Sequence, residues 1–284
     1  MKHILLPTDF SENAYNAIAY AVQLLRNETC TFYLLHTYTP VIVSAGSMMD
    51  SYSALTLQQA ARETSERQLE TVKSRIRDEF PNTNHEFITM ASFNMLIPEM
   101  VEVVQKHHID FVVMGTQGAT GAKEVFLGTH TMYVIKKLKC PVLAVPAQFK
   151  YEAPKEILFP TDFKLNRENS YLSMVHELCT KQVARLHILN AYYGTPLTAE
   201  QLENKTFLDS YFADNAVLFH LAEGTDVPGA IEQFQIKHKI NLMVMIHNKH
   251  NFLENILFKP VINQMVYHTH VPFLVIPSLA RHSS

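Results

Sequence analysis

One segment of this chain occurs twice. The letters KHILLPTDF at 2–10 return as KEILFPTDF at 155–163, with seven of nine positions identical. Two later pairs also correspond, namely IDFVVMG (109–115) with INLMVMI (240–246) and CPVLAVP (140–146) with VPFLVIP (271–277). An internal repeat of this extent indicates two copies of one folding unit, and each copy needs a core of its own.

The spacing of the repeats predicts two domains of unequal length. The first pair lies 153 positions apart and the two later pairs 131, so the second copy lacks 22 residues between them. The total of 284 residues accommodates two domains of ordinary size. A proline-containing segment, PAQFKYEAPKE at 146–156, joins the copies. We therefore expect the boundary near Phe149 or Lys150, with domains at 1–149 and 150–284.

Each copy alternates short apolar runs with longer segments of helical period, a pattern typical of a parallel sheet built from βαβ units. In the first copy the pattern predicts strands at 3–7, 30–36, 84–90, 110–114 and 141–146, and helices at 12–26, 55–79, 93–107 and 129–138. In the second it predicts strands at 156–160, 184–190, 216–221, 241–246 and 271–276, with a shorter second helix within 197–213. Ser11 and Ser92 are candidate helix N-caps. Each copy is thus expected to be a doubly wound α/β domain.

Composition limits the function classes. Hydrophobic residues make up 47% and charged residues 18%, as in soluble globular proteins. The net charge of −3 and the absence of a basic run argue against nucleic acid as a partner. No apolar run is long enough to span a membrane, and the amino terminus reaches Pro7 and Asp9 too soon for a signal peptide, so we expect a cytoplasmic protein. Three scattered cysteines predict buried, reduced thiols rather than a disulfide framework.

A glycine-rich loop is the strongest functional signal. The stretch MGTQGATGAKEVFLGTHT at 114–131 holds four of the chain's eight glycines, and it connects a predicted strand to a predicted helix. Glycine backbone can approach a ligand closely, and the first turn of a helix offers free N–H groups to an anion. The pattern predicts a phosphate site, although turn geometry alone is the alternative. If the first and fourth strands are neighbours, Asp9 lies at the same edge of the sheet.

The spacing of these glycines matches neither common nucleotide motif. Both the Walker pattern and the GxGxxG fingerprint after the first strand are absent. Present instead is Gly-x2-Gly-x9-Gly-Ser/Thr, formed by Gly115, Gly118, Gly128 and Thr129. Together with the segments ILLPTDFS, FYLLHTY, DFVVMGTQGATG and CPVLAVP, this pattern makes each half resemble a universal stress protein domain. The whole chain resembles a tandem universal stress protein.

The resemblance implies a fold and an assembly. It implies two doubly wound five-stranded parallel sheets of the adenine nucleotide alpha hydrolase-like type, with strand order 3-2-1-4-5. Domains of this family commonly pair through their last strands, which implies an intramolecular pseudo-dimer of the two halves. Whether the chain pairs further into a homodimer, and with which protein it interacts, stays open.

The resemblance also implies ATP, or another adenine nucleotide, as ligand in the first half, with Mg²⁺ or Mn²⁺ accompanying the phosphates. Carried over by position, Asp9 faces adenine and ribose, and the backbone at Thr37 meets the adenine edge. The phosphate and ribose loop corresponds to Gly115, Gly118, Gly128 and Thr129, with Thr131 as a further phosphate contact. Asp9 and Thr129 have a structural alternative, since either could cap the helix that follows it.

The second copy has lost the loop. At the constant offset of 131, Gly115, Gly118, Gly121, Gly128 and Thr129 become Ile246, Lys249, Phe252, Lys259 and Pro260. Residues with a Cβ resist positive φ, and proline lacks a backbone donor. We therefore expect a second domain that keeps the fold, and Asp162, but binds no nucleotide. A solvated basic loop and an anion site at Lys249 and Lys259 are the alternative roles of the new lysines.

Two further segments leave alternatives open. HNKH at 247–250, with His268 and His270, could hold zinc or could be a set of scattered surface histidines. SAGSMMDSYSAL at 44–55 is expected to be a loop, with a mobile lid or a partner-binding surface as the alternative.

Three functions compete at this level. The first is a nucleotide-binding stress or signalling protein, the second a slow ATPase and the third a scaffold that binds no nucleotide. Rapid hydrolysis needs a base and cations around the transferring group. The loop offers only Lys123 as a cation and no convincing base, which favours binding over turnover.

Overall fold

The structure is a computed structural model that describes residues 1–39, 51–116, 129–192, 196–223, 227–247 and 270–278. The first half of the chain forms β1 (Lys2–Pro7), α1 (Glu12–Leu24), β2 (Cys30–Thr37), α2 (Ser51–Glu79), β3 (His85–Ser92), α3 (Leu96–Lys106), β4 (Phe111–Gly115), α4 (Thr129–Lys137) and β5 (Val142–Val145). The second half forms β6 (Glu156–Pro160), α5 (Leu172–Gln182), β7 (Arg185–Tyr192), α6 (Ala199–Tyr211), β8 (Ala216–Glu223), α7 (Val227–His238), β9 (Leu242–His247) and β10 (Phe273–Pro277).

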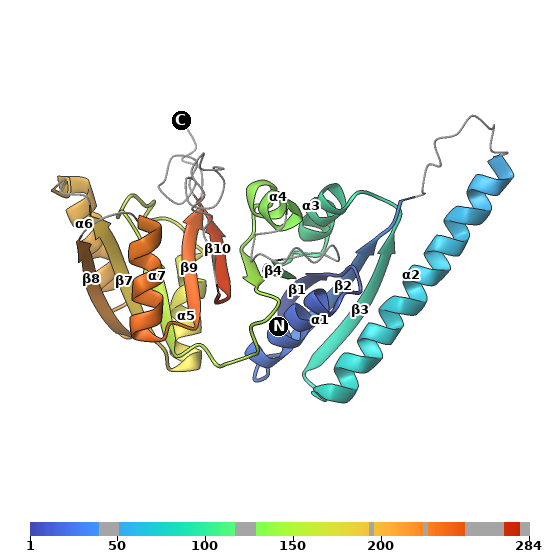
Figure 1. The fold of residues 1–284 in the computed structure, drawn as a ribbon, viewed down its shortest axis with the longest axis horizontal. Helices are drawn as coiled ribbons and strands as arrows, with labels where there is room; N and C mark the ends of the chain where they lie inside the picture. The colour runs from blue at the N-terminus through green and yellow to red at the C-terminus, as the bar shows by residue number, and fades with distance from the viewer. Residues whose placement is uncertain (40–50, 117–128, 193–195, 224–226, 248–269, 279–284) are drawn as a thin grey trace.

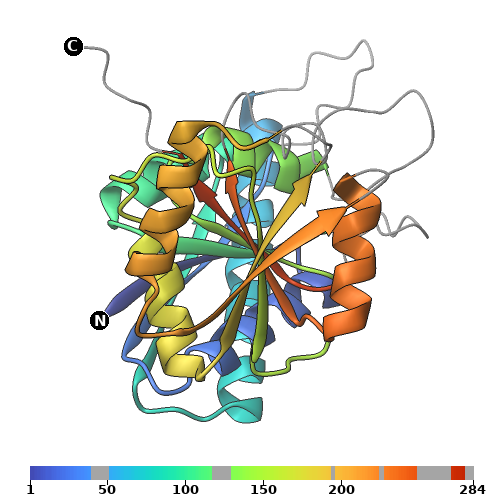
Figure 2. The same cartoon turned by 90° about the vertical axis from the view of Figure 1, so that its left-hand side faces the viewer.

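All ten strands lie in one sheet of order β3-β2-β1-β4-β5-β10-β9-β6-β7-β8 (Figure 1). Within each half the strands are parallel, and the order is 3-2-1-4-5 when they are counted along that half. The predicted α/β class and doubly wound order are therefore confirmed. Figure 2 shows the twist of this sheet from the end formed by the second half.

The two halves join through their closing strands. β10 pairs with β5 antiparallel, in the register Phe273↔Ala144, Leu274↔Leu143 and Val275↔Val142. Every side chain in these pairs is at most 2% exposed. Because both strands are central and apolar, neither half presents an open sheet edge at this position. The expected contact between the closing strands is present.

Helices cover both faces of the sheet, which buries alternate residues of each strand on opposite sides. On one face α1, α2, α5 and α6 pack on a core that includes Ile4, Leu6 and Phe159. On the other face α3, α4 and α7 pack on a core that includes Leu5 and Met243. Both cores run across the junction of the halves. None of the helices within the described ranges is long and apolar enough to cross a membrane.

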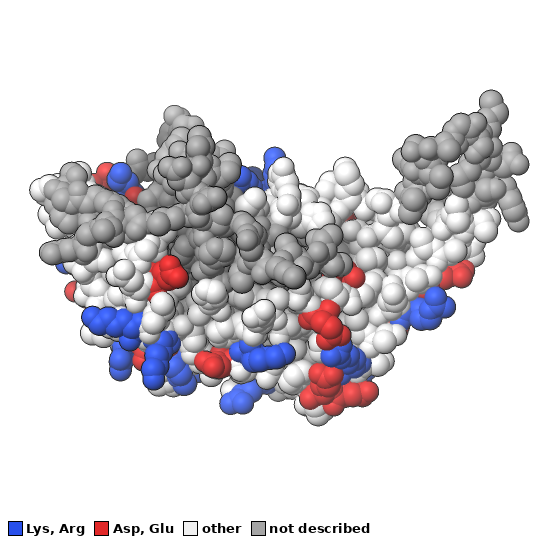
Figure 3. Space-filling model, viewed as in Figure 1, with Lys and Arg blue, Asp and Glu red and all other residues white. Residues whose placement is uncertain are grey.

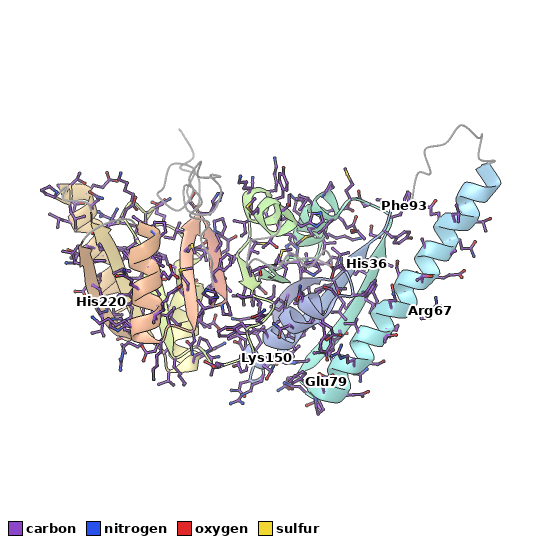
Figure 4. All side chains as sticks on the ribbon, viewed as in Figure 1. His36, Arg67, Glu79, Phe93, Lys150 and His220 are labelled. Atoms are coloured by element: carbon purple, nitrogen blue, oxygen red, sulfur yellow. The ribbon has the colours of Figure 1, made fainter. Side chains whose placement is uncertain are left out.

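The linker between β5 and β6 is packed on the first half. Asn16 in α1 donates from Nδ2 to the carbonyl oxygens of Phe149 at 3.0 Å and Pro146 at 3.3 Å. The rings of Tyr20 and Tyr151 meet edge to face at 5.2 Å. The position of Lys150 within this linker, below the junction of the two halves, is labelled in Figure 4.

An ion-pair network joins the two halves. Across the junction, Lys2 pairs with Glu177 at 2.9 Å and Glu28 pairs with Lys181 at 2.7 Å. Within the halves, Lys2 also pairs with Glu28 at 3.2 Å and Lys181 with Glu177 at 2.5 Å. Figure 3 shows charged side chains of both signs intermixed along the lower margin of the molecule.

Two sequence-based expectations are wrong. Ser92 does not cap a helix, because β3 extends to Ser92, which pairs with Thr37 of β2. α3 begins at Leu96 instead, with Met95 at the cap position. Residues 51–55 are not a loop, because α2 begins at Ser51. No glycine or proline occurs between Gly46 and Pro81, so nothing in that stretch breaks the helix.

Candidate functional site

The predicted site lies at the carboxyl ends of β1 and β4. These strands are parallel neighbours, and their ladder consists of Ile4↔Phe111 and Leu5↔Val112. Successive strands are added on one side of β1 up to β3 and on its other side from β4 onward, which makes this position the switch point at which doubly wound sheets bind ligands. Asp9 follows β1, and Gly115 ends β4. The structure therefore brings the two predicted features to one edge of the sheet.

A compact turn follows β1. Thr8 Oγ1 accepts from the backbone N–H of Phe10 at 3.0 Å, and Asp9 Oδ1 accepts from the N–H and the hydroxyl of Ser11 at 3.1 and 2.5 Å. Phe10 has a φ of 65°, which is uncommon for a bulky residue. Ser11 caps α1 by accepting from Ala14 N–H. The helix cap is therefore Ser11, and Asp9 holds an exposed carboxylate beside the first turn of α1.

The end of β2 closes one side of the turn. His36 Nδ1 lies 2.8 Å from the carbonyl oxygen of Thr8 and donates to it, and its ring packs on Phe10 at 4.2 Å between centroids. Thr37 is half-buried at the last position of β2 and pairs with Ser92. Figure 4 labels His36 in this region and Phe93 just beyond β3.

The end of β4 and the start of α4 form the opposite side. Gly115 pairs with Val145, and its carbonyl oxygen accepts from the hydroxyl of Thr131 at 2.9 Å. Thr131 is 2% exposed, and this hydrogen bond links the first turn of α4 to the end of β4. Thr129, at the start of the helix, is exposed. Thr116 is also buried, and within the described part of the chain its Oγ1 has no hydrogen-bond partner. Gly118, Gly121, Gly128 and Lys123 lie outside the described residues.

The second half repeats the turn in a different setting. Thr161 Oγ1 accepts from Phe163 N–H at 2.9 Å, Asp162 Oδ1 accepts from Lys164 N–H at 3.1 Å, and φ of Phe163 is 58°. α1 begins three positions after Asp9, whereas α5 begins at Leu172, ten positions after Asp162. Burial raises the pKa of the Asp162 carboxyl. The second half therefore places no helix N-terminus directly behind its aspartate.

The halves also differ where the glycine loop begins. Gly115 pairs with Val145 in β5, and Ile246 pairs with Ile276 in β10, so the two positions are equivalent in the sheet. Ile246 is 4% exposed and its side chain belongs to the core. Lys249, Phe252, Lys259 and Pro260 lie outside the described residues, as do His250 and His268.

Sequence reasoning missed a histidine cluster in the second half. His187 is 1% exposed, its Nε2 donates to Glu156 Oε2 at 2.7 Å, and its Nδ1 lies 3.0 Å from His220 Nε2. His238 lies 5.2 Å from His187 between ring centroids and stacks on Phe234 at 4.0 Å. Desolvation and the neighbouring His187 lower the pKa values of His220 and His238. A histidine inside the apolar run of β7 was the available signal.

The three cysteine thiols are buried, and burial explains their raised pKa values. The three cysteines are unpaired and buried, as expected. Burial raises the pKa of the Cys30 thiol to about 11 and those of Cys140 and Cys179 to about 12. In the described part of the chain, no group of three or more His, Cys, Asp or Glu side chains is arranged to hold a metal ion.

Comparison with known proteins finds relatives of about half of this chain. Universal stress protein MJ0531 of Methanocaldococcus jannaschii is 29% identical over 147 residues, which are 51% of this chain and 81% of that protein. Universal stress protein MJ0577 of the same organism is 27% identical over 155 residues, 51% of this chain and 94% of that protein.

A solved structure extends the similarity of fold to both halves. A universal stress protein from Archaeoglobus fulgidus DSM 4304 matches with a TM-score of 0.65 at 18% identity, covering 97% of this chain and 96% of that one. The sequence model of the universal stress protein family matches residues 1–146, which are more than half of the chain. The chain therefore belongs to the universal stress protein family.

Proposed function

We propose that the first half of this chain, residues 1–149, binds ATP or another adenine nucleotide at the carboxyl ends of β1 and β4. Occupancy of that site tunes the conformation of the protein or its choice of partner in a stress response. The second half, residues 150–284, is a copy that keeps the fold and binds no nucleotide. The nucleotide would be held by Asp9, Thr37, Gly115, Gly118, Gly128, Thr129 and Thr131, with Mg²⁺ or Mn²⁺ on its phosphates.

The asymmetry between the halves carries this proposal. At the end of the fourth strand, the first half has Gly115 and the second half has the buried side chain of Ile246. After the first strand, α1 begins three residues beyond Asp9, whereas α5 begins ten residues beyond Asp162. A glycine leaves room for a ligand to approach the backbone, and a helix N-terminus attracts anions. Among the described residues of the two halves, these two features occur together in the first half alone.

The donors and acceptors at this edge suit an adenine nucleotide. The first turn of α4, from Thr129, presents backbone N–H groups that no residue within the helix can accept. The exposed carboxylate of Asp9 can accept from a ribose hydroxyl. Thr116 Oγ1 is a buried hydroxyl that no described residue satisfies, and such a group costs about 1–3 kcal/mol unless it finds a partner. A ligand that rearranges this region could supply one.

Calorimetric titration of Mg·ATP into the full chain tests the proposal. We expect saturation at one site per chain. Asp9→Asn keeps an oxygen for the turn but removes the charge, so it should weaken binding about 10-fold or more, the value of a hydrogen bond to a charged group. Asp162→Asn, the same change in the second half, is the matched control and should bind as the wild type does.

Two further measurements separate the competing functions. Gly118→Lys should abolish binding, since a long side chain would fill the loop. Phosphate release by the wild type above that of Gly118→Lys would identify an ATPase. Absence of binding by folded protein, judged by heat and by thermal shift, would refute the proposal and favour a scaffold.

A further inference from the structure

A pocket of about 440 Å³ lies in the second half, far from the candidate nucleotide site. Its lining includes Phe163 after β6, Asn190 in β7, Leu197 and Lys205 around α6, and Phe219 in β8. β8 is the last strand of the sheet, and strands β5, β10, β9 and β6 separate β7 from the β1–β4 pair. Figure 4 shows this separation, with His220 of β8 at one end of the molecule and His36 of β2 toward the other.

The walls and size of the pocket suit a small organic molecule. Phe163 is 2% exposed, Leu197 and Phe219 are half-buried, and Leu221 is exposed. Pockets that bind small ligands measure roughly 300–1,000 Å³ and combine apolar walls with a few polar groups. The aromatic side chains favour a flat apolar body between them.

Asn190 supplies an acceptor that none of the described residues uses. It is 6% exposed, and its Nδ2 donates to the carbonyl oxygen of Thr161 at 3.0 Å. In the first half His36 Nδ1 makes the same link to Thr8 at 2.8 Å. The link between strand and turn therefore does not require an amide, and the amide adds Oδ1, which has no partner among the residues that the structure describes. A hydrogen-bond donor on a ligand would satisfy it.

Lys205 supplies the positive charge. Its Nζ lies 5.6 Å from the centroid of the Phe219 ring. Its neighbour on α6, Glu203, pairs with Arg167 at 2.8 Å. Within the described ranges no carboxylate pairs with Lys205, and its ammonium group stands beside the apolar ring of Phe219.

We propose that this pocket binds a small aromatic carboxylic acid that also carries a hydrogen-bond donor. The ring lies among Phe163, Leu197 and Phe219, the carboxylate pairs with Lys205, and the donor reaches Asn190 Oδ1. The second half thus has a ligand of its own, of a class unrelated to nucleotides, and its binding does not depend on the nucleotide site of the first half.

The probe for the test is 4-hydroxyphenylacetate, titrated into the full chain by calorimetry and by amide NMR. A ligand of this size is expected to bind with Kd of about 0.1–1 mM. Phenylacetate lacks the donor and should bind about 10-fold more weakly. Tyramine, which has an ammonium group in place of the carboxylate, should not bind.

Two variants assign the polar contacts. Lys205→Met keeps the apolar stem and should weaken 4-hydroxyphenylacetate about 10-fold, while Lys237→Met on α7 is a matched control that should change nothing. Asn190→His keeps the link to Thr161, as His36 does in the first half, and removes the amide oxygen. This variant should reduce the preference for 4-hydroxyphenylacetate over phenylacetate, because the amide oxygen is lost and the imidazole acceptor, Nε2, occupies a different position.

Three results would overturn the proposal. The first is that folded wild-type protein shows no saturable binding of 4-hydroxyphenylacetate. The second is that Lys205→Met binds it with the affinity of the wild type. The third is that the ligand changes amide chemical shifts at the carboxyl ends of β1 and β4 instead of those in α6 and β8. Unchanged titrations in the presence of Mg·ATP would support independence of the two sites. Loss of ATP binding in Asp9→Asn with retained binding of 4-hydroxyphenylacetate would separate this proposal from the nucleotide site.

Discussion

Replacing Phe163 by glycine tests whether burial or backbone strain dominates at the repeated turn. Phe163 is 2% exposed and packs in the core, yet its backbone is left-handed with φ of 58°. Loss of a buried phenylalanine side chain costs about 3–5 kcal/mol. Glycine relieves the left-handed conformation by about 1–2 kcal/mol. The difference predicts that Phe163→Gly lowers the free energy of unfolding by about 1–4 kcal/mol, with a central value of about 2.5 kcal/mol.

Phe10 provides a matched comparison because its backbone has the same conformation, with φ of 65°. Its side chain is only half-buried and packs on His36. The packing lost on Phe10→Gly is therefore about half as large, near 2 kcal/mol, and the relief of strain is unchanged at about 1–2 kcal/mol. The two effects nearly cancel, so this variant should stay within about 1 kcal/mol of the wild type.

Urea unfolding of the full chain, followed by circular dichroism, measures both differences, with equal m-values as the condition for comparing them. Phe163→Leu, which keeps apolar volume and the strained backbone, should lose only about 1 kcal/mol. Equal destabilisation by the two glycine variants would refute the reasoning, because it would mean that the buried ring at Phe163 contributes no more than the half-buried ring at Phe10.

Three other outcomes follow from the structure. The pKa values of His220 and His238 are lowered in the folded protein, so below about pH 6.5 the unfolded chain binds more protons than the folded one. Thermal melts should therefore show stability falling as the pH drops from 7 to 5, and His220→Gln should make that fall smaller. Hydrogen bonds from Lys181 and Lys2 outweigh burial and lower the pKa of Glu177; Glu177→Gln should cost about 0.5–1 kcal/mol in urea at low salt and less at 1 M salt. Ser11→Ala should cost about 1 kcal/mol in urea through loss of the α1 cap, and a loss below 0.3 kcal/mol would contradict that role.

The sequence predicts a structural feature correctly where a short segment of the chain determines it. The cap at Ser11, the buried strands and the short second helix of the second half all depend on nearby residues, and α6 spans 13 residues where α2 spans 29. Ser92 differs from its predicted role because a serine before a polar stretch is compatible with either a helix cap or the end of a strand. Pairing with Thr37, which lies 55 positions away, decides that it is a strand residue.

The candidate site was predictable to the same extent. The neighbouring positions of β1 and β4 follow from the doubly wound pattern, and they bring Asp9 and Gly115 to one edge of the sheet. The engagement of the Thr131 hydroxyl by Gly115 and the isolation of Thr116 Oγ1 were not predictable. Both depend on how α4 packs against the end of β4, which is a matter of tertiary packing.

The sequence by itself determined that the chain repeats, that each copy is a doubly wound α/β unit and that the copies differ at the glycine loop. Those properties are written in periodicity and residue type, which act locally. Only the tertiary structure decided that β5 and β10 pair antiparallel into one sheet, that His187, His220 and His238 gather beside Glu156, and that Asn190 and Lys205 line one pocket. These arrangements bring together residues far apart in the chain, and the packing of apolar faces, rather than any local preference, selects them.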